Sequence, residues 1–292
     1  MNKAQSTQTP LATEKISTLL WNFAVPSIIA MLVSSLYNIV DQFFIGRSVG
    51  ELGNAATNIS FPLSISCVAA ALLFGIGGAS AFNISAGKGQ EDPDEKKKAV
   101  FYIGNASALL FCCGILLFIL TQLFLSPMLQ FFGSPDDVLP YAKIYTRIVS
   151  YGFPFFILAT GGGHLIRADG RPKYTMICNL AGAAINTVLD ALFVFVFSWG
   201  MAGAALATVI GQVVSGSMAI WLLWHGKTIQ LNRGHLVLRK EYILRIISLG
   251  AAPCTNQIAM MVLQIVMNQS LKYYGRMSVY GESIPLACTG II

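Results

Sequence analysis

Two carboxylic acids lie inside long apolar stretches of this sequence, where an ionised side chain is costly. Asp190 lies within the run from Cys178 to Gln212, and Asp41 lies in the first apolar run of the chain. The other eleven of the 13 acidic residues fall in loops, tails or the ends of such runs. Acidic side chains at membrane depth usually face a cavity, a partner or an ion. Asp41 and Asp190 are therefore the first candidates for chemistry.

Two neutral oxygen-bearing side chains accompany Asp190. Asn186 precedes it by four residues, so both lie on one face of a helix. The chain then turns at Trp199–Gly200, and Thr208 follows on the returning segment. From Asp190 to the turn is roughly 12 Å along a helix, and the return to Thr208 is about the same, at ~1.5 Å per residue. Antiparallel packing is expected to bring all three side chains to one depth.

A carboxylate pair with an amide and a hydroxyl can bind Na⁺ through its oxygen atoms, or it can take up a proton. Two carboxylates close together in a low dielectric cannot both stay ionised without a large cost. The sequence leaves H⁺ and Na⁺ open as alternatives, and we expect no cofactor besides such an ion. A structural interpretation also stays open, with Asp41 and Asp190 as separate caps and with Asn186 and Thr208 in ordinary interhelical hydrogen bonds.

Further polar side chains lie near these positions. Tyr37, Asn38 and Gln42 flank Asp41, and Tyr145 lies in a later apolar stretch. They are candidates for the lining of a cavity. The tyrosines are equally suited to the aromatic belts found at membrane interfaces.

The composition places these residues in a membrane protein. The chain is 55% hydrophobic and 11% charged, with a mean hydropathy of +0.65, whereas soluble domains carry about 25% charged residues. We predict an all-α polytopic membrane protein. The glycine clusters at 75–80 and 200–203 lie in apolar stretches rather than after strands, so they are not phosphate-binding loops. No catalytic motif is present, and we predict that the protein is not an enzyme.

Seven apolar stretches have the length of about 20 residues that a membrane-spanning helix needs. They cover about 19–45, 54–85, 99–122, 142–166, 174–198, 202–224 and 242–271, and an eighth begins near 279. Fourteen of the 19 Lys and Arg residues fall on the side of the N-terminus. This bias predicts a cytoplasmic N-terminus in the plasma (inner) membrane. The net charge of +6 then faces anionic lipid rather than nucleic acid.

The sequence contains an internal repeat. Aligning Pro26 with Pro253 places Asn268 opposite Asp41, and NISFPLS (58–64) resembles ESIPLAC (282–288). Six spans precede the second copy, and an even number preserves topology, so two halves should be related by an axis along the membrane normal. We predict a cytoplasmic tail (1–17), an N-lobe six-helix bundle (18–224), an inter-lobe linker (225–241) and the start of a C-lobe (242–292) of a monomeric protein with roughly twelve spans.

Three segments resemble the multidrug and toxic compound extrusion (MATE) family of secondary transporters. They are VDQFFIGRSVGELGNAATNISFPL (40–63), RADGRPKYTMICNLAGAAINTVLDALFVF (167–195) and WGMAGAALATVIGQ (199–212). The resemblance implies two six-helix lobes around a central cavity, alternating access, and cation-coupled export of organic, often cationic compounds. In the branch resembling the DNA-damage-inducible type, it also implies a coupling-ion site in the N-lobe. The residues that match this site are Asp41, Asn186, Asp190 and Thr208.

The expected function is therefore a secondary active antiporter that exports small organic compounds in exchange for H⁺ or Na⁺. The alternative is a flippase for lipid-linked saccharides, which shares this general architecture. A flippase is expected to carry several arginines inside its cavity. No Arg or Lys lies in the middle of a predicted span, and this favours the antiporter.

Overall fold

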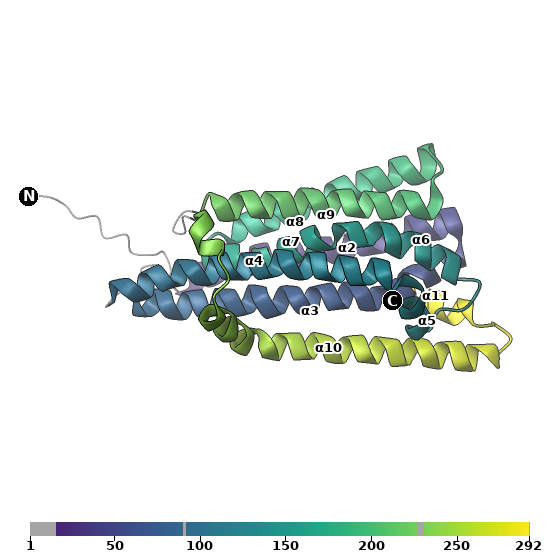
Figure 1. Ribbon diagram of the computed structural model, residues 1–292. Coiled ribbons are helices and arrows are strands. Elements are labelled where there is room, and N and C mark those ends of the chain that lie inside the picture. Colours follow the sequence, from purple (N-terminus) through teal and green to yellow (C-terminus); the bar gives the residue numbers. More distant parts are fainter. Residues whose placement is uncertain (1–15, 90–91, 227–230, 292) are drawn as a thin grey trace, which may run out of the picture.

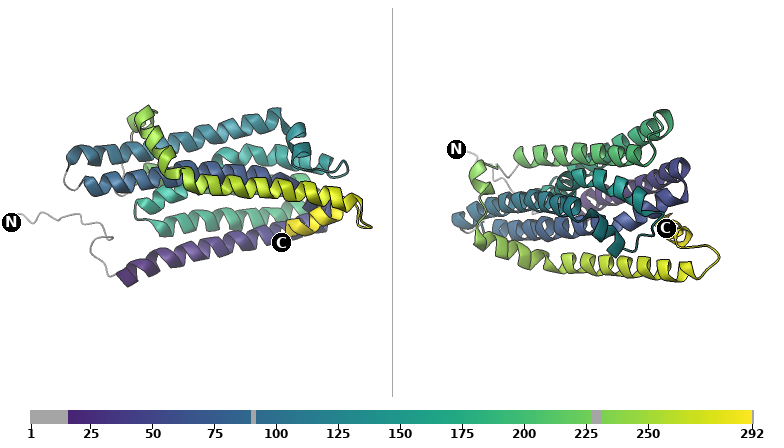
Figure 2. Two further views of the ribbon diagram at one scale, coloured as in Figure 1. Left: turned by 90° about the horizontal axis from the view of Figure 1, so that it is seen from below. Right: turned by 45° about the vertical axis from the view of Figure 1, so that its right-hand side comes forward.

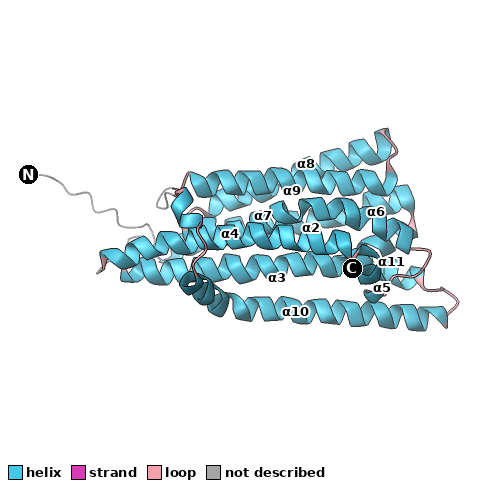
Figure 3. Ribbon diagram, in the orientation of Figure 1, coloured by secondary structure: helices cyan, strands magenta, loops and turns pink. Residues whose placement is uncertain are grey.

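The computed structural model describes residues 16–89, 92–226 and 231–291. Within these ranges every regular element is a helix, as Figure 3 shows. Seven helical segments are long and apolar enough to cross a membrane. The predicted all-α polytopic fold and its number of complete spans are confirmed. Most of the predicted tail (1–15) and part of the predicted linker (227–230) lie outside the described residues.

The spans begin and end where the sequence places proline and glycine. Pro93, Pro140, Pro154 and Pro172 each stand in the first turn of a helix, where the missing N–H costs nothing. The α-helices are α2 (Ile16–Val49), α3 (Glu51–Lys88), α4 (Pro93–Leu123), α5 (Leu125–Phe131), α6 (Leu139–Val149), α7 (Phe153–Ala168), α8 (Pro172–Asp190), α9 (Gly200–Trp224), α10 (Lys240–Arg276) and α11 (Ser283–Ile291).

The helices run side by side around α3 (Figures 1 and 2). α3 contacts α2, α4, α6, α7, α10 and α11. In Figure 1, α8 and α9 lie on one side of the bundle and α10 lies on the other. The start of α2, the end of α9 and the start of α10 lie at one end, which we call the N-terminal end. The α2–α3, α8–α9 and α10–α11 turns lie at the opposite end, as expected for consecutive membrane crossings.

Helices α8 and α9 form a hairpin that is joined by a tight turn and packed closely farther along both helices. Its turn places Ser198 and Gly200 at positive φ, 53° and 54°, a backbone region that glycine occupies at little cost. Farther along, a Cβ atom on Gly211 would lie 2.8 Å from the carbonyl oxygen of Gly182. Only glycine allows such an approach, so the pair sets how closely α8 and α9 pack. A π-helical segment, Ala191–Val196, follows Asp190 directly.

α10 packs directly on the backbone of α3. A Cβ atom on Gly77 would collide with the carbonyl group of Ile246, so glycine at this position lets the two helices meet. Nearer the other end of α10, the Nζ of Lys272 donates a hydrogen bond of 2.7 Å to the carbonyl oxygen of Ser134. α10 is therefore held against α3 near its start and against the segment before α6 near its end.

Candidate functional site

The fold brings the two intramembrane acids together. Asp41 on α2 is 6% exposed, and Asp190 at the end of α8 is fully buried. Their carboxyl groups lie within hydrogen-bonding reach of each other. A carboxylate has no hydrogen to donate, so this contact becomes a hydrogen bond only when one of the two acids carries a proton. Without a proton or a cation between them, the pair would be two like charges in a low dielectric.

Three of the four carboxyl oxygen atoms of this pair lack a hydrogen-bond donor among the described residues. Oδ1 of Asp41 and both carboxyl oxygens of Asp190 accept no hydrogen bond from a donor among the described residues. Buried polar atoms are normally satisfied, because leaving them without a partner is costly. The arrangement therefore fits an additional bound group that carries positive charge, either a proton or a small cation.

Asn186 and Thr208 complete the predicted set. The Nδ2 of Asn186 donates a long hydrogen bond of 3.5 Å to Oγ1 of Thr208, across the close α8–α9 contact. The Oδ1 of Asn186 is buried and accepts no hydrogen bond from the described residues. We call Asp41, Asn186, Asp190 and Thr208 the carboxyl site. No cluster of three His, Cys, Asp or Glu side chains suited to a metal ion occurs in the described ranges.

A cavity of about 650 Å³ lies beside the carboxyl site. Its walls come from α2, α3, α7, α8 and α9, and both Asn186 and Thr208 line it. Much of the remaining wall is apolar, with side chains such as Met31, Leu72 and Phe156. Small-molecule sites typically have this size and this mixture of apolar wall with a few polar groups. The carboxyl site and a space for an organic molecule therefore share two residues.

Three of the predicted lining residues, Asn38, Gln42 and Tyr145, are not among the residues that line this cavity. The side chain of Tyr37 is outside what the structure describes, and Asn38 is exposed. The amide oxygen of Gln42 accepts a hydrogen bond of 3.1 Å from the hydroxyl group of Thr57. Tyr145 is partly buried and packs against the hydrophobic core. A role for these residues in a larger cavity stays a prediction.

The sequence analysis missed one charged residue of the cavity. Arg167 falls just beyond the predicted span 142–166, but the structure places it in the cavity wall with His164 and Thr160. The three residues follow one another at i, i+4 and i+7 of α7, which puts them on one helix face. That spacing was the available signal. Gln212 also lines the cavity, and its buried Oε1 accepts no hydrogen bond from a described residue.

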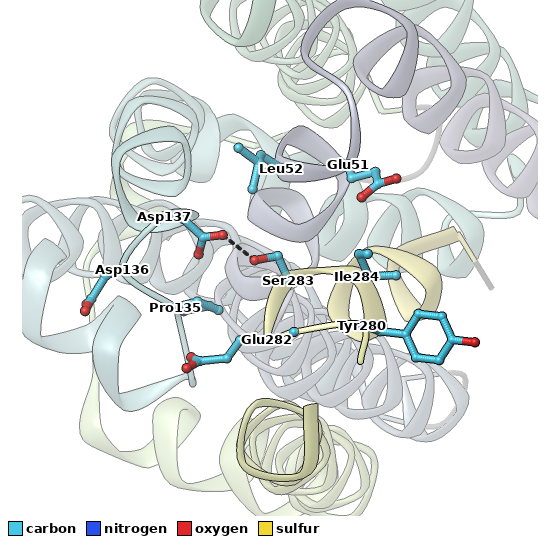
Figure 4. A pocket seen from close by; sticks show the side chains of 10 residues that line it. Glu51, Leu52, Pro135, Asp136, Asp137, Tyr280, Glu282, Ser283 and Ile284 are labelled. Carbon is cyan, nitrogen blue, oxygen red and sulfur yellow. Dashed lines mark hydrogen bonds between the residues drawn. The ribbon is translucent and has the colours of Figure 1, made fainter. Parts of the chain in front are cut away.

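A second pocket, of about 540 Å³, lies at the opposite end of the molecule from the N-terminal end. Figure 4 shows that acidic side chains from three parts of the chain surround it, Glu51, Asp136, Asp137 and Glu282. The hydroxyl group of Ser283 donates a hydrogen bond to Asp137, and Arg276 forms an ion pair of 2.6 Å with Glu282. These acids lie in loops or at helix ends rather than in the middle of a span.

Comparison with known proteins places the chain in a family. Residues 26–192 match the MatE family model. The multidrug export protein MepA of Staphylococcus saprophyticus is 28% identical over 91% of this chain and 58% of its own length. MepA of Staphylococcus aureus (strain NCTC 8325) is 27% identical, again over 91% of this chain and 58% of its own length.

The structure is similar to that of the MATE multidrug transporter DinF-BH in complex with rhodamine 6G. The TM-score is 0.86 at 29% sequence identity, over 99% of this chain and 62% of that one. The chain thus spans about three fifths of the length of the relatives that it matches.

Proposed function

Because the chain belongs to the MatE family, a family of transporters rather than enzymes, we propose that the complete protein is a secondary active antiporter. In this proposal it exports organic compounds across the plasma membrane in exchange for H⁺ or Na⁺, as a monomer with a cytoplasmic N-terminus. The observation that carries the proposal is the contact between two buried carboxyl groups, Asp41 and Asp190, beside a cavity of small-molecule size.

The carboxyl site gives ion binding a mechanical consequence. Asp41 belongs to α2, whereas Asp190 belongs to α8, and the two helices contact each other. With both carboxylates ionised and no ion bound, their repulsion disfavours this contact. A proton or Na⁺ between them removes the repulsion and allows α2 to pack closely on α8. The bound ion therefore favours one arrangement of α2 over another, as coupled transport requires.

The cavity connects the ion to the exported compound. Asn186 and Thr208 belong both to the carboxyl site and to the cavity wall. A compound that displaces the hydrogen bond between them alters the surroundings of Asp190, and an ion that recruits their oxygen atoms alters the cavity. Each ligand then changes the affinity for the other by the same factor. This reciprocity is the thermodynamic basis of exchange.

The relatives support organic compounds as the transported class. Two are named multidrug export proteins, and one structure holds rhodamine 6G. A flippase for lipid-linked saccharides is the alternative, and it is expected to line its cavity with several arginines. The cavity described above contains one, Arg167, which favours the antiporter.

The proposal is tested by removing each carboxylate in the complete gene product. Asp41→Asn and Asp190→Asn keep the side-chain shape but lose the ionisable group. Both variants should reach the membrane in wild-type amounts and confer no resistance to rhodamine 6G. Asp136→Asn, which changes an exposed loop acid, is the matched control and should confer full resistance. Wild-type resistance from either site variant would overturn the proposal.

A further inference from the structure

The charge of the cavity wall does not match a purely cationic ligand. None of the described residues that line the cavity is Asp or Glu. Its one permanently charged side chain is Arg167, and His164 lies beside it. Asp41 and Asp190 are not among the residues that line the cavity. The cavity therefore has a positive end, near the last turn of α7.

Arg167 has no acidic ion-pair partner among the described residues, whereas its neighbour Arg171 pairs with Asp169 at 2.7 Å. Arg171 also donates a hydrogen bond of 2.8 Å to the carbonyl oxygen of Leu222 at the end of α9. The nearby acid and the helix end are thus used by Arg171, and the guanidinium of Arg167 keeps its charge for another partner.

His164 holds the Arg167 side chain. A distance of 3.2 Å separates the Nη2 of Arg167 from Nδ1 of His164. Arginine can only donate, so the ring nitrogen accepts this hydrogen bond and the ring is the neutral tautomer with its hydrogen on Nε2. A guanidinium has five N–H groups in a planar fork, which match the two oxygen atoms of a carboxylate or phosphate. One is directed at His164, and the others remain for a ligand.

We propose that the Arg167 end of the cavity binds the anionic group of an amphipathic organic compound, a carboxylate, sulfonate or phosphate. The rest of the ligand would lie along the apolar wall toward Asn186 and Gln212. Each of these amides has a buried oxygen atom without a donor among the described residues, and such oxygens suit N–H groups. The cavity therefore also accommodates organic anions and zwitterions, in addition to cationic compounds. The inference rests on the proposed function only for the statement that the bound compound is exported.

The test uses two dyes with one ring system. Rhodamine 6G is a cationic ethyl ester, and its hydrolysis product is the free carboxylic acid, a zwitterion. Binding of each is titrated by fluorescence anisotropy to the complete protein in phosphatidylcholine nanodiscs. Arg167→Gln should weaken binding of the free acid about tenfold or more, the effect of losing a charged hydrogen-bonded pair. Binding of the ester should change less than about twofold.

Two further variants separate charge from packing. Arg167→Lys keeps the positive charge and should lose less affinity for the acid than Arg167→Gln. Arg245→Gln removes an exposed arginine of α10 that does not line the cavity, and it should change neither dye. Equal losses for the acid and the ester in Arg167→Gln would show a packing role and overturn the proposal. Unchanged binding of the acid would overturn it as well.

The anion could come from a soluble compound or from a lipid headgroup, and a second arm distinguishes them. Phosphatidylglycerol is added to the nanodiscs. If it weakens binding of the acid to wild type but not to Arg167→Gln, a lipid headgroup occupies the same site. If it has no effect, the site takes soluble anions.

The outcome is also separable from the antiporter proposal. Loss of acid binding in Arg167→Gln alongside a wild type that exports neither dye would retain the anion site and reject the antiporter. Export of rhodamine 6G by the wild type, together with unchanged binding of the free acid in Arg167→Gln, would retain the antiporter and reject the anion site.

Discussion

Two long helices carry a proline and, 15 residues later, a buried polar side chain, but the two side chains meet different surroundings. In α2 the pair is Pro26 and Asp41, and in α10 it is Pro253 and Asn268. Asp41 faces a second carboxyl group, Asp190. The Oδ1 of Asn268 instead accepts a hydrogen bond of 3.2 Å from Nε2 of Gln264.

The α10 position belongs to a network of neutral amides. Gln264 also donates to Oδ1 of Asn58 on α3 at 2.8 Å. The Nδ2 of Asn58 in turn donates to the carbonyl oxygen of Leu286 at 2.8 Å and to the hydroxyl group of Thr289 at 2.9 Å, both on α11. We call Asn58, Gln264 and Asn268 the amide network.

The comparison shows that a carboxyl group and an amide at equivalent positions of two helices differ in whether the site can change its charge. Amides both donate and accept, so they can hydrogen-bond to one another without a proton or a cation, and their charge is fixed. Within the network only Nδ2 of Asn268 is buried without an acceptor among the described residues. Two carboxyl groups cannot satisfy one another without a proton or a cation. Of these two sites, only the carboxyl site can therefore change its charge during a transport cycle, whereas the amide network ties α3, α10 and α11 together.

The largest effect is expected from placing an acid in the amide network. Asn268→Asp would bury a carboxyl group next to Gln264, while the lysine one turn away on α10, Lys272, is engaged by the carbonyl oxygen of Ser134. Breaking the balance of a buried polar site in this way costs about 3 kcal/mol or more. Thermal unfolding followed by tryptophan fluorescence should show a markedly lower midpoint and a lower yield of protein. A midpoint equal to the wild type would mean that α10 tolerates an acid as α2 does, and the comparison would fail.

Removing the centre of the network should have a smaller effect. Gln264→Leu leaves Oδ1 of both Asn58 and Asn268 without a donor, which costs about 1–3 kcal/mol. Gln269→Leu is the matched control, because Gln269 is exposed and donates only to the carbonyl oxygen of Phe131 among the described residues. The first variant should unfold at a clearly lower temperature than the second. Equal midpoints would show that the network contributes nothing to the packing of α10.

Stability and function should separate at Asp41. In Asp41→Asn the new amide can donate a hydrogen bond to Asp190, so like-charge repulsion is removed and the unfolding midpoint should stay equal or rise. Coupled export should nevertheless be lost. Asp41→Ala is the control that removes the side chain altogether, and it should lower the midpoint. A large loss of stability in Asp41→Asn would indicate a structural acid rather than an ion site.

The smallest effect is expected at Thr208. Thr208→Val preserves the shape but removes the acceptor of the 3.5 Å hydrogen bond from Asn186. Interhelical hydrogen bonds in membranes average about 0.6 kcal/mol, so the unfolding midpoint should change little. The concentration of coupling ion needed for half-maximal export should rise if Oγ1 contributes to the site. Thr208→Ser, which keeps the hydroxyl group, should behave as the wild type. If Thr208→Val and Thr208→Ser need the same ion concentration for half-maximal export, Oγ1 of Thr208 does not contribute to the ion site.

Much of the fold and part of the site follow from the sequence. Apolar runs bounded by proline and glycine predict the spans, because lipid demands long helices. The rarity of acids inside those runs singles out Asp41 and Asp190. Arg167 escaped notice because a charge at the end of an apolar run is typical of a loop, and only the packing of α7 against α8 and α9 places it in a cavity. The amide network depends on which face of α10 meets α3, and periodicity does not encode that choice.

The most direct test of the carboxyl site is rhodamine 6G efflux from vesicles that contain the complete protein. Efflux is measured under an imposed pH gradient and, separately, under an imposed Na⁺ gradient, with Asp190→Asn beside the wild type. We predict that one of the gradients drives efflux by the wild type. Neither should drive it in Asp190→Asn, although this variant still binds the dye. Gradient-driven efflux by Asp190→Asn at the wild-type rate would contradict the assignment of the buried carboxyl pair as the coupling site.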